Sequence, residues 1–174
     1  MSRQLTAADA RQSLTAHVAE RGTEIFARFG PQIGWKELLQ ILEDRTLVRY
    51  PVTIDFDAGP LQPGEFAWPE PLGDSPEDGF RLCVHPMFMT NLSQVPFLVF
   101  YQLVVVNYGG FAGHEEAETF AAAALGLDRE TYYQTVCALA DQLGSGIDPG
   151  FTPPVPAAPL LPMMPHTCGG GGCG

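Results

Sequence analysis

Positive charge is scarce in this sequence of 174 residues. Nine Lys and Arg stand against 20 Asp and Glu, which gives a formal net charge of −11, and Lys36 is the only lysine. A surface this acidic repels the phosphates of nucleic acids and the anionic headgroups of lipids. We therefore expect neither nucleic acid nor a membrane surface among the partners of this chain.

The sequence also has no long hydrophobic run. Its most apolar window covers residues 95–106, whereas a membrane-spanning helix needs roughly 20 apolar residues. The first 26 residues contain no uninterrupted apolar stretch of the kind that forms a signal peptide. These two observations predict a cytoplasmic protein without a membrane span.

Cysteine is sparse as well, with four residues at positions 83, 137, 168 and 173. A small secreted domain held together by disulfides has a denser pattern. Cys137 falls in a helical pattern, where we expect it to be a small buried apolar side chain. With 45% hydrophobic residues, the chain has enough apolar material for a core, and its length is that of one domain.

Two helices are predicted in the first 43 residues. Thr6 and Asp9 have the spacing of a capping box, and apolar residues then recur at helical spacing over 14–29. Gly22 interrupts this run and predicts a bend or two shorter helices. A second, short helix is expected over 35–43.

Residues 47–85 change to the alternation that is typical of strands. Residues 47–56 predict a first strand, which belongs at a sheet edge because Pro51 cannot donate to a ladder. Short strands are expected over 65–68 and 80–85, with an acidic loop between them. A small, mostly antiparallel sheet accommodates all three.

The segment from residue 94 to residue 143 returns to helical spacing. We expect Ser93 to cap a central helix that is apolar almost all round, although the valines at 104–106 also suit a strand. Two further helices follow, divided by Gly126 and Asp128 and joined as an antiparallel or angled hairpin. The prediction is an α+β domain over residues 1–146, with a small sheet packed against about five helices.

Proline marks the next segment. Seven of the 16 prolines fall between positions 149 and 165, so residues 147–165 are expected to form an extended, polyproline-like strap. The strap carries Phe151, Leu160 and Leu161, which is unusually apolar for a linker. It is therefore expected to lie on the surface of the domain or to dock on a protein partner.

The terminal segment, residues 166–174, reads HTCGGGGCG. His166, Cys168 and Cys173 supply one imidazole and two thiols within eight residues. The four glycines between the thiols restrict the backbone little, so the segment can fold around one ion. Sulfur and imidazole ligands suit zinc, copper(I), nickel or an iron–sulfur centre, and they disfavour magnesium and calcium. The spacing differs from that of standard zinc-finger patterns.

Three ligands leave one coordination position open. Cys83 and His85 fall on the same side of the predicted strand over 80–85 and are candidates to close the site, if the terminus returns to the domain. Met163 and Met164 are thioethers near the same place and tilt the choice toward copper(I). Zinc or copper(I) is therefore favoured over an iron–sulfur centre.

Three other interpretations stay open. The glycine-rich terminus can be disordered, with thiols that are idle or joined in a local disulfide. Its Thr-Cys and Gly-Cys pairs also look somewhat like those that ring-forming enzymes convert to azolines in peptide substrates. Finally, His85, Tyr101 and Gln102 are candidates for an enzyme active site, although a hydrogen-bonded structural role is favoured for each.

The favoured function is therefore not catalytic. The sequence predicts an accessory or metal-handling protein whose terminal His166, Cys168 and Cys173 bind a soft metal ion. The first alternative is a structural or interaction subunit of a larger complex that docks through residues 147–165.

Overall fold

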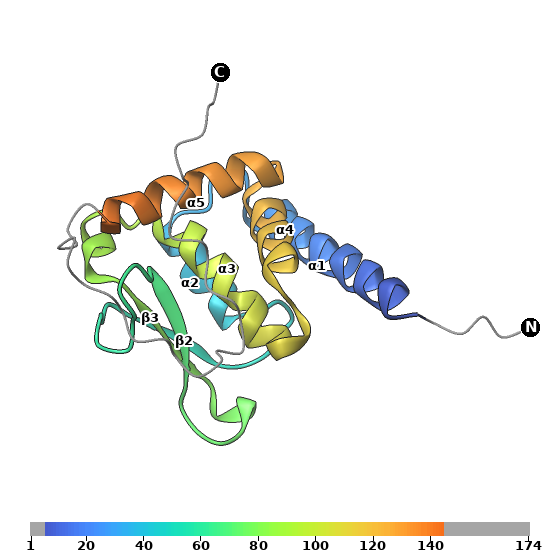
Figure 1. Cartoon of the computed structure of the whole chain (residues 1–174), viewed down its shortest axis with the longest axis horizontal. Coiled ribbons are helices and arrows are strands. Elements are labelled where there is room, and N and C mark those ends of the chain that lie inside the picture. Colours follow the sequence, from blue (N-terminus) through green and yellow to red (C-terminus); the bar gives the residue numbers. More distant parts are fainter. Residues whose placement is uncertain (1–5, 145–174) are drawn as a thin grey trace, which may run out of the picture.

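The structure, a computed structural model, describes residues 6–144 and confirms the α+β class. The predicted strap and the terminal segment therefore lie outside the described residues. Five α-helices and a three-stranded sheet make up the described part of the chain (Figure 1). They are α1 (Ala7–Phe29), α2 (Trp35–Glu43), β1 (Val52–Asp55), β2 (Ala67–Pro71), β3 (Phe80–Val84), α3 (Val95–Tyr108), α4 (His114–Leu125) and α5 (Arg129–Gly144).

Helix α3 lies at the centre of the domain. It packs against α4 on one side and against β2 and β3 on another (Figure 1). Because neighbours surround it, nearly its whole circumference is buried, including Val104 and Val106. This position explains why the run over 95–106 is apolar all round, and it confirms the helix rather than the competing strand.

The first helix is continuous over 23 residues. Its capping box is present: the Thr6 hydroxyl accepts a hydrogen bond from the Asp9 backbone N–H at 3.2 Å, and the Asp9 carboxylate accepts one from the Thr6 N–H at 3.0 Å. The predicted interruption at Gly22 was wrong. Gly22 is buried against α4, where a Cβ atom would lie 2.5 Å from the Phe120 carbonyl oxygen, so the glycine permits a close approach of two helices.

The sheet is mixed, with strand order β1-β3-β2. β3 pairs with β1 in parallel and with β2 in antiparallel orientation. β1 occupies an edge, as Pro51 predicts, and β2 occupies the other edge, which is why it accommodates Pro69 and Pro71. Since β1 and β2 lie on opposite edges, the connection over residues 56–66 must cross β3.

The first strand is shorter than the predicted 47–56 because its beginning is bound elsewhere. The side chain of Asn107 in α3 accepts a hydrogen bond from the Arg49 N–H at 2.8 Å and donates one to the Leu47 carbonyl at 3.2 Å. These bonds take the backbone groups that a strand would need for pairing. Regular pairing therefore begins only at Val52.

The caps of the later helices agree with the sequence except at α3. Gln94, not Ser93, is the N-cap of α3, and the Ser93 hydroxyl instead bonds the Asn91 side chain at 2.6 Å. Gly126 ends α4 in the left-handed conformation, and Asp128 caps α5 by accepting from the Thr131 N–H at 2.9 Å. Helix α5 crosses the end of α4 at a steep angle (Figure 1).

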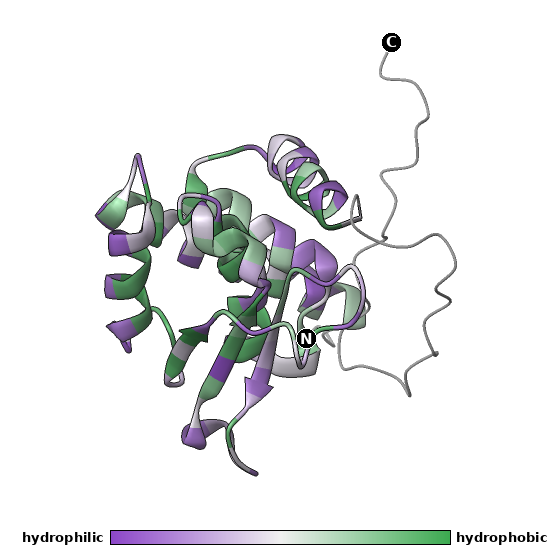
Figure 2. Ribbon diagram, turned by 90° about the vertical axis from the view of Figure 1, so that its left-hand side faces the viewer, coloured by the Kyte–Doolittle hydropathy of each residue, from purple (hydrophilic) through white to green (hydrophobic). Residues whose placement is uncertain are grey.

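Hydrophobic side chains from the helices and the sheet pack into one core. In the ribbon coloured by hydropathy, hydrophilic residues are prominent on the peripheral helices (Figure 2). Within residues 6–144, none of the helices has the length and hydrophobicity that a membrane crossing requires.

Candidate functional site

Of the five predicted metal ligands, three lie outside the described residues: His166, Cys168 and Cys173. Cys83 is in β3 and His85 follows that strand directly. Cys83 is next to Leu82 and Val84 in the core, and its neighbour on the same face of the strand is Arg81. His85 lies just outside the strand, at the N-cap of the following turn, so the alternation of β3 alone does not place its side chain beside that of Cys83.

The Cys83 thiol is enclosed. Its exposed fraction is 0%, and its sulfur lies 3.9 Å from the Arg81 carbonyl oxygen. Burial raises the pKa of the Cys83 thiol, against an opposing effect of the nearby Arg81. A metal binds the thiolate, so this residue is poorly prepared for coordination in the described conformation.

The His85 imidazole serves as the N-cap of a short 3-10 turn over Pro86–Thr90. Its Nδ1 accepts a hydrogen bond from the Met87 backbone N–H at 3.3 Å, and burial lowers its pKa. The neutral ring that this bond requires carries its proton on Nε2. A metal would need that nitrogen unprotonated, so coordination through Nε2 requires the other tautomer and the loss of the Met87 bond.

A pocket of about 390 Å³ adjoins this imidazole. The crossing connection supplies Leu61 and Pro63 to its wall, and Leu143, in the last turn of α5, also lines it. The described chain thus ends at the pocket that His85 lines.

Acidic residues around the sheet form ion pairs with an arginine, which the sequence pattern did not indicate. Arg81 of β3 forms ion pairs with Glu70 of β2 at 2.7 Å, with Asp55 of β1 at 3.1 Å and with Asp57, which follows β1, at 3.4 Å. One arginine therefore links all three strands. The guanidinium thus engages all three carboxylates, although its single positive charge balances only one of them. Within residues 6–144, no group of three or more His, Cys, Asp or Glu has an arrangement that could hold a metal ion.

The polar residues of α3 are engaged in hydrogen bonds. Gln102 donates to the Ala67 carbonyl at 3.0 Å and so fixes α3 to β2. The Tyr101 hydroxyl lies 2.5 Å from Nδ1 of His114. Neither Tyr101 nor Gln102 lines the pocket beside His85, so the three candidates for an active site are not brought together there.

Glu116, at the start of α4, caps its own helix. The Glu116 carboxylate, 2% exposed, accepts from the Gly113 N–H at 2.8 Å and from the Thr15 hydroxyl at 3.0 Å. Burial opposes ionisation, but these bonds outweigh it and lower the pKa of Glu116. Every buried polar side-chain atom in the described part of the chain has a hydrogen-bond partner.

Comparison of the chain with family models, curated proteins and solved structures finds no match. The chemistry of the residues themselves therefore carries the functional argument.

Proposed function

We propose that this chain is a non-catalytic, cytoplasmic accessory protein that binds one soft metal ion, zinc or copper(I), through His166, Cys168 and Cys173. The observation that carries the proposal is the density of donors: one imidazole and two thiols within eight residues, with four glycines between the thiols. A reducing compartment keeps such thiols available for coordination. The fourth position is open to a donor from a partner, which suits a protein that receives or delivers an ion.

The proposed ligand set leaves out Cys83 and His85 for reasons of local chemistry. Burial favours the protonated thiol of Cys83, and the Met87 N–H occupies Nδ1 of His85. The pocket beside His85 lies next to the point from which the C-terminal segment continues, because Leu143 lines it. The proposed ligands therefore follow, in the sequence, the residues that line this pocket.

The test is the metal content of the full chain, purified without a histidine tag and equilibrated with zinc in air or copper(I) without oxygen. One equivalent is expected in the wild type and none in the double variant Cys168→Ser, Cys173→Ser. Cys83→Ala is the matched control, since it removes a thiol outside the proposed set, and it should keep one equivalent. His166→Gln should weaken binding, because one of three ligands is lost.

Equal metal content in the wild type and the double variant would overturn the proposal. The proposal would also be overturned if the wild type contained no metal and a thiol titration found Cys168 and Cys173 in disulfides, either with each other or with Cys137. Intact mass measured in the same samples tests the azoline alternative, because each ring formed removes one water from the chain.

The interaction of the strap with a protein partner is a second proposal, carried by the apolar side chains at Phe151, Leu160 and Leu161. Deleting residues 147–165 while keeping 166–174 should abolish co-purification of the partner, with unchanged helical circular dichroism and unchanged metal content. This variant separates the two proposals, since metal binding survives and docking does not.

A further inference from the structure

Positive charge, scarce in the chain, gathers in one hollow of the domain. Arg21 of α1, together with Arg45 and Arg49 of the segment between α2 and β1, lines a pocket of about 210 Å³. His17 of α1 and Tyr108 of α3 also line it. In a protein of net charge −11, this hollow brings three cationic side chains together, an arrangement that attracts an anion.

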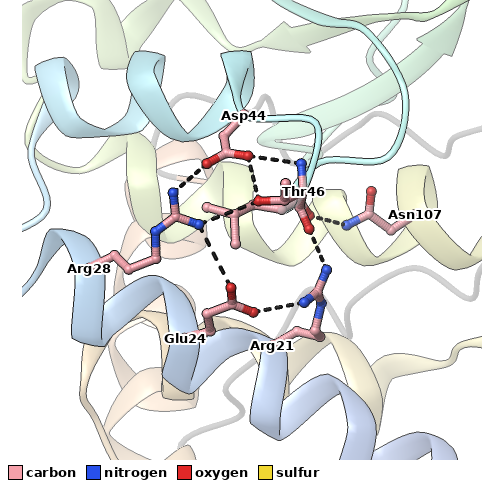
Figure 3. A network of polar contacts seen from close by, with 7 residues as sticks. Arg21, Glu24, Arg28, Asp44, Thr46 and Asn107 are labelled. Atoms are coloured by element: carbon pink, nitrogen blue, oxygen red, sulfur yellow. Dashed lines mark hydrogen bonds and ion pairs between the residues drawn. The ribbon is translucent and has the colours of Figure 1, made fainter.

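The walls of this pocket are fixed by a network of polar contacts (Figure 3). Arg21 donates to the Thr46 carbonyl and forms an ion pair with Glu24 at 2.7 Å. Thr46 is held in turn by Asp44, which accepts from its N–H at 2.8 Å and from its hydroxyl at 2.6 Å. The segment that carries Arg45 and Arg49 is therefore attached to α1, as well as to α3 through Asn107.

Two guanidinium groups at the pocket have no carboxylate partner among residues 6–144. Arg45 donates to the carbonyl oxygens of Val48 and Tyr50, and Arg49 lies over the Tyr50 ring, 5.3 Å from its centroid. Across residues 6–144, no Asp or Glu lies within ion-pair distance of either one.

The acids around the pocket are engaged with other groups. Glu24 pairs with Arg21 and Arg28, and Asp44 pairs with Arg28. Glu77 is the acid that Arg49 faces at longer range, and its carboxylate is bonded to the Ser75 hydroxyl. Two cations thus remain uncompensated at close range, and an incoming anion would supply the missing charge.

An apolar hollow of about 480 Å³ continues from the basic pocket. The two share Arg49, Asn107 and Tyr108, so they lie side by side. Leu14, Val105 and Phe111 line the apolar part, and Phe111 is 90% exposed, an unusual position for a large aromatic side chain. The combination is a groove with a cationic end and a hydrophobic body.

We propose that this groove, formed by the two hollows, binds a small organic anion with an apolar body. Its carboxylate or phosphate head lies among Arg21, Arg45 and Arg49, where the planar guanidinium of Arg49 forms paired hydrogen bonds with two oxygens of the head. Its hydrocarbon part lies against Leu14, Val105 and Phe111. The size of the hollows is that of a small-molecule site, and the negative charge elsewhere on the protein disfavours nucleic acid.

The experiment is a calorimetric titration of the full chain with octanoate and with octyl phosphate, each below its micelle concentration. Octanol and inorganic phosphate serve as the two half-ligands, one without charge and one without an apolar body. At least one amphiphilic anion should bind saturably, at least tenfold more tightly than either half-ligand. The tighter of the two anions identifies the head group as carboxylate or phosphate.

Three exposed side chains allow variants that do not disturb the core. Arg49→Gln should weaken binding tenfold or more, and Phe111→Ser should weaken it severalfold. Lys36→Gln, which removes one positive charge outside the groove, should leave it unchanged. The proposal is overturned if neither anion binds saturably, if octanol or inorganic phosphate binds as tightly as the amphiphiles, or if Arg49→Gln behaves like Lys36→Gln.

Discussion

Gly22 of α1 lies directly against the backbone of α4 at Phe120. A Cβ atom built at Gly22 would be 2.5 Å from the Phe120 carbonyl oxygen and 2.7 Å from the Cβ of Ala123. These distances are well below van der Waals contact, so the two helices can lie this close only because position 22 has no side chain.

Gly22→Ala sets two effects against each other. Helix propensity favours alanine in a helix interior by about 1 kcal/mol, whereas overpacking a tight interface costs about 1–3 kcal/mol. The steric effect should win, because the atom that Cβ meets belongs to the backbone and cannot rotate away. We expect a net loss of about 1–2 kcal/mol in the free energy of unfolding, measured with urea. Ala27→Gly, at an exposed position of the same helix, is the control for propensity alone; a stabilised Gly22→Ala protein would contradict the close approach.

Tyr132 of α5 joins that helix to α3. Its ring is fully buried and stacks on Phe97 with centroids 6.5 Å apart, and its hydroxyl donates to the Phe97 carbonyl at 2.7 Å. Tyr132→Phe removes only the hydrogen bond and should cost about 1 kcal/mol. Tyr132→Ala also leaves a cavity and should cost about 3–5 kcal/mol. Denaturation curves of both variants check this ratio, and equal losses would show that packing contributes little.

Asp44 makes stability depend on acid pH. Hydrogen bonds from the Thr46 hydroxyl and N–H and from Arg28 hold the pKa of Asp44 at about 2, below the value of about 3.9 in an unfolded chain. The folded state therefore binds this proton less readily, so the stabilisation is complete above about pH 4 and is lost as the pH falls toward 2. Asp44→Asn should unfold more easily than the wild type at pH 7, and the difference should shrink between pH 4 and pH 2. Asp74→Asn, in an exposed loop, is the control, and a difference independent of pH would contradict the assignment.

Asn107 fixes the segment before β1 to α3. The substitution Asn107→Asp puts a carboxylate oxygen opposite the Leu47 carbonyl oxygen, so one hydrogen bond is replaced by repulsion in a buried place. Attraction between the new carboxylate and the arginines that line the same hollow offsets part of this repulsion, so we expect a net loss of about 1–2 kcal/mol in the free energy of unfolding at neutral pH. The loss should decrease in mild acid, where the introduced carboxyl group becomes protonated and can donate again. Urea titrations at two pH values measure it, and a loss unchanged between them would argue against the repulsion.

The Cys83 thiol should react slowly in the native protein. It is fully buried and burial raises its pKa, so both access and the fraction of thiolate are low. Alkylation of Cys83, followed by mass spectrometry of the peptide that contains it, should be slower in buffer than in concentrated urea by a factor on the order of 100 or more. Rapid labelling of the native protein would contradict the burial of Cys83.

Local interactions made much of the fold readable from the sequence. The capping box of Thr6 and Asp9, the helix over 35–43, the left-handed end at Gly126 and the cap at Asp128 all depend on residues within a few positions of one another. The burial of α3 was also readable, because its composition leaves no polar face. For the candidate metal ligands, the sequence shows only that His and Cys residues lie close together along the chain. Their spacing does not specify which of them bind the same ion.

Contacts between distant parts of the chain decided the rest. The continuity of α1 at Gly22 depends on α4, and the late start of β1 depends on Asn107, about sixty residues further on. The meeting of Arg21, Arg45 and Arg49 around one hollow depends on the packing of α1 against the segment that follows α2. The sequence by itself determined the positions of most helices, the caps at Thr6, Gly126 and Asp128, and the apolar centre, because these follow from periodicity and near neighbours. Only the tertiary structure decided the sheet order and the basic groove, because those require side chains from separate elements to be brought together.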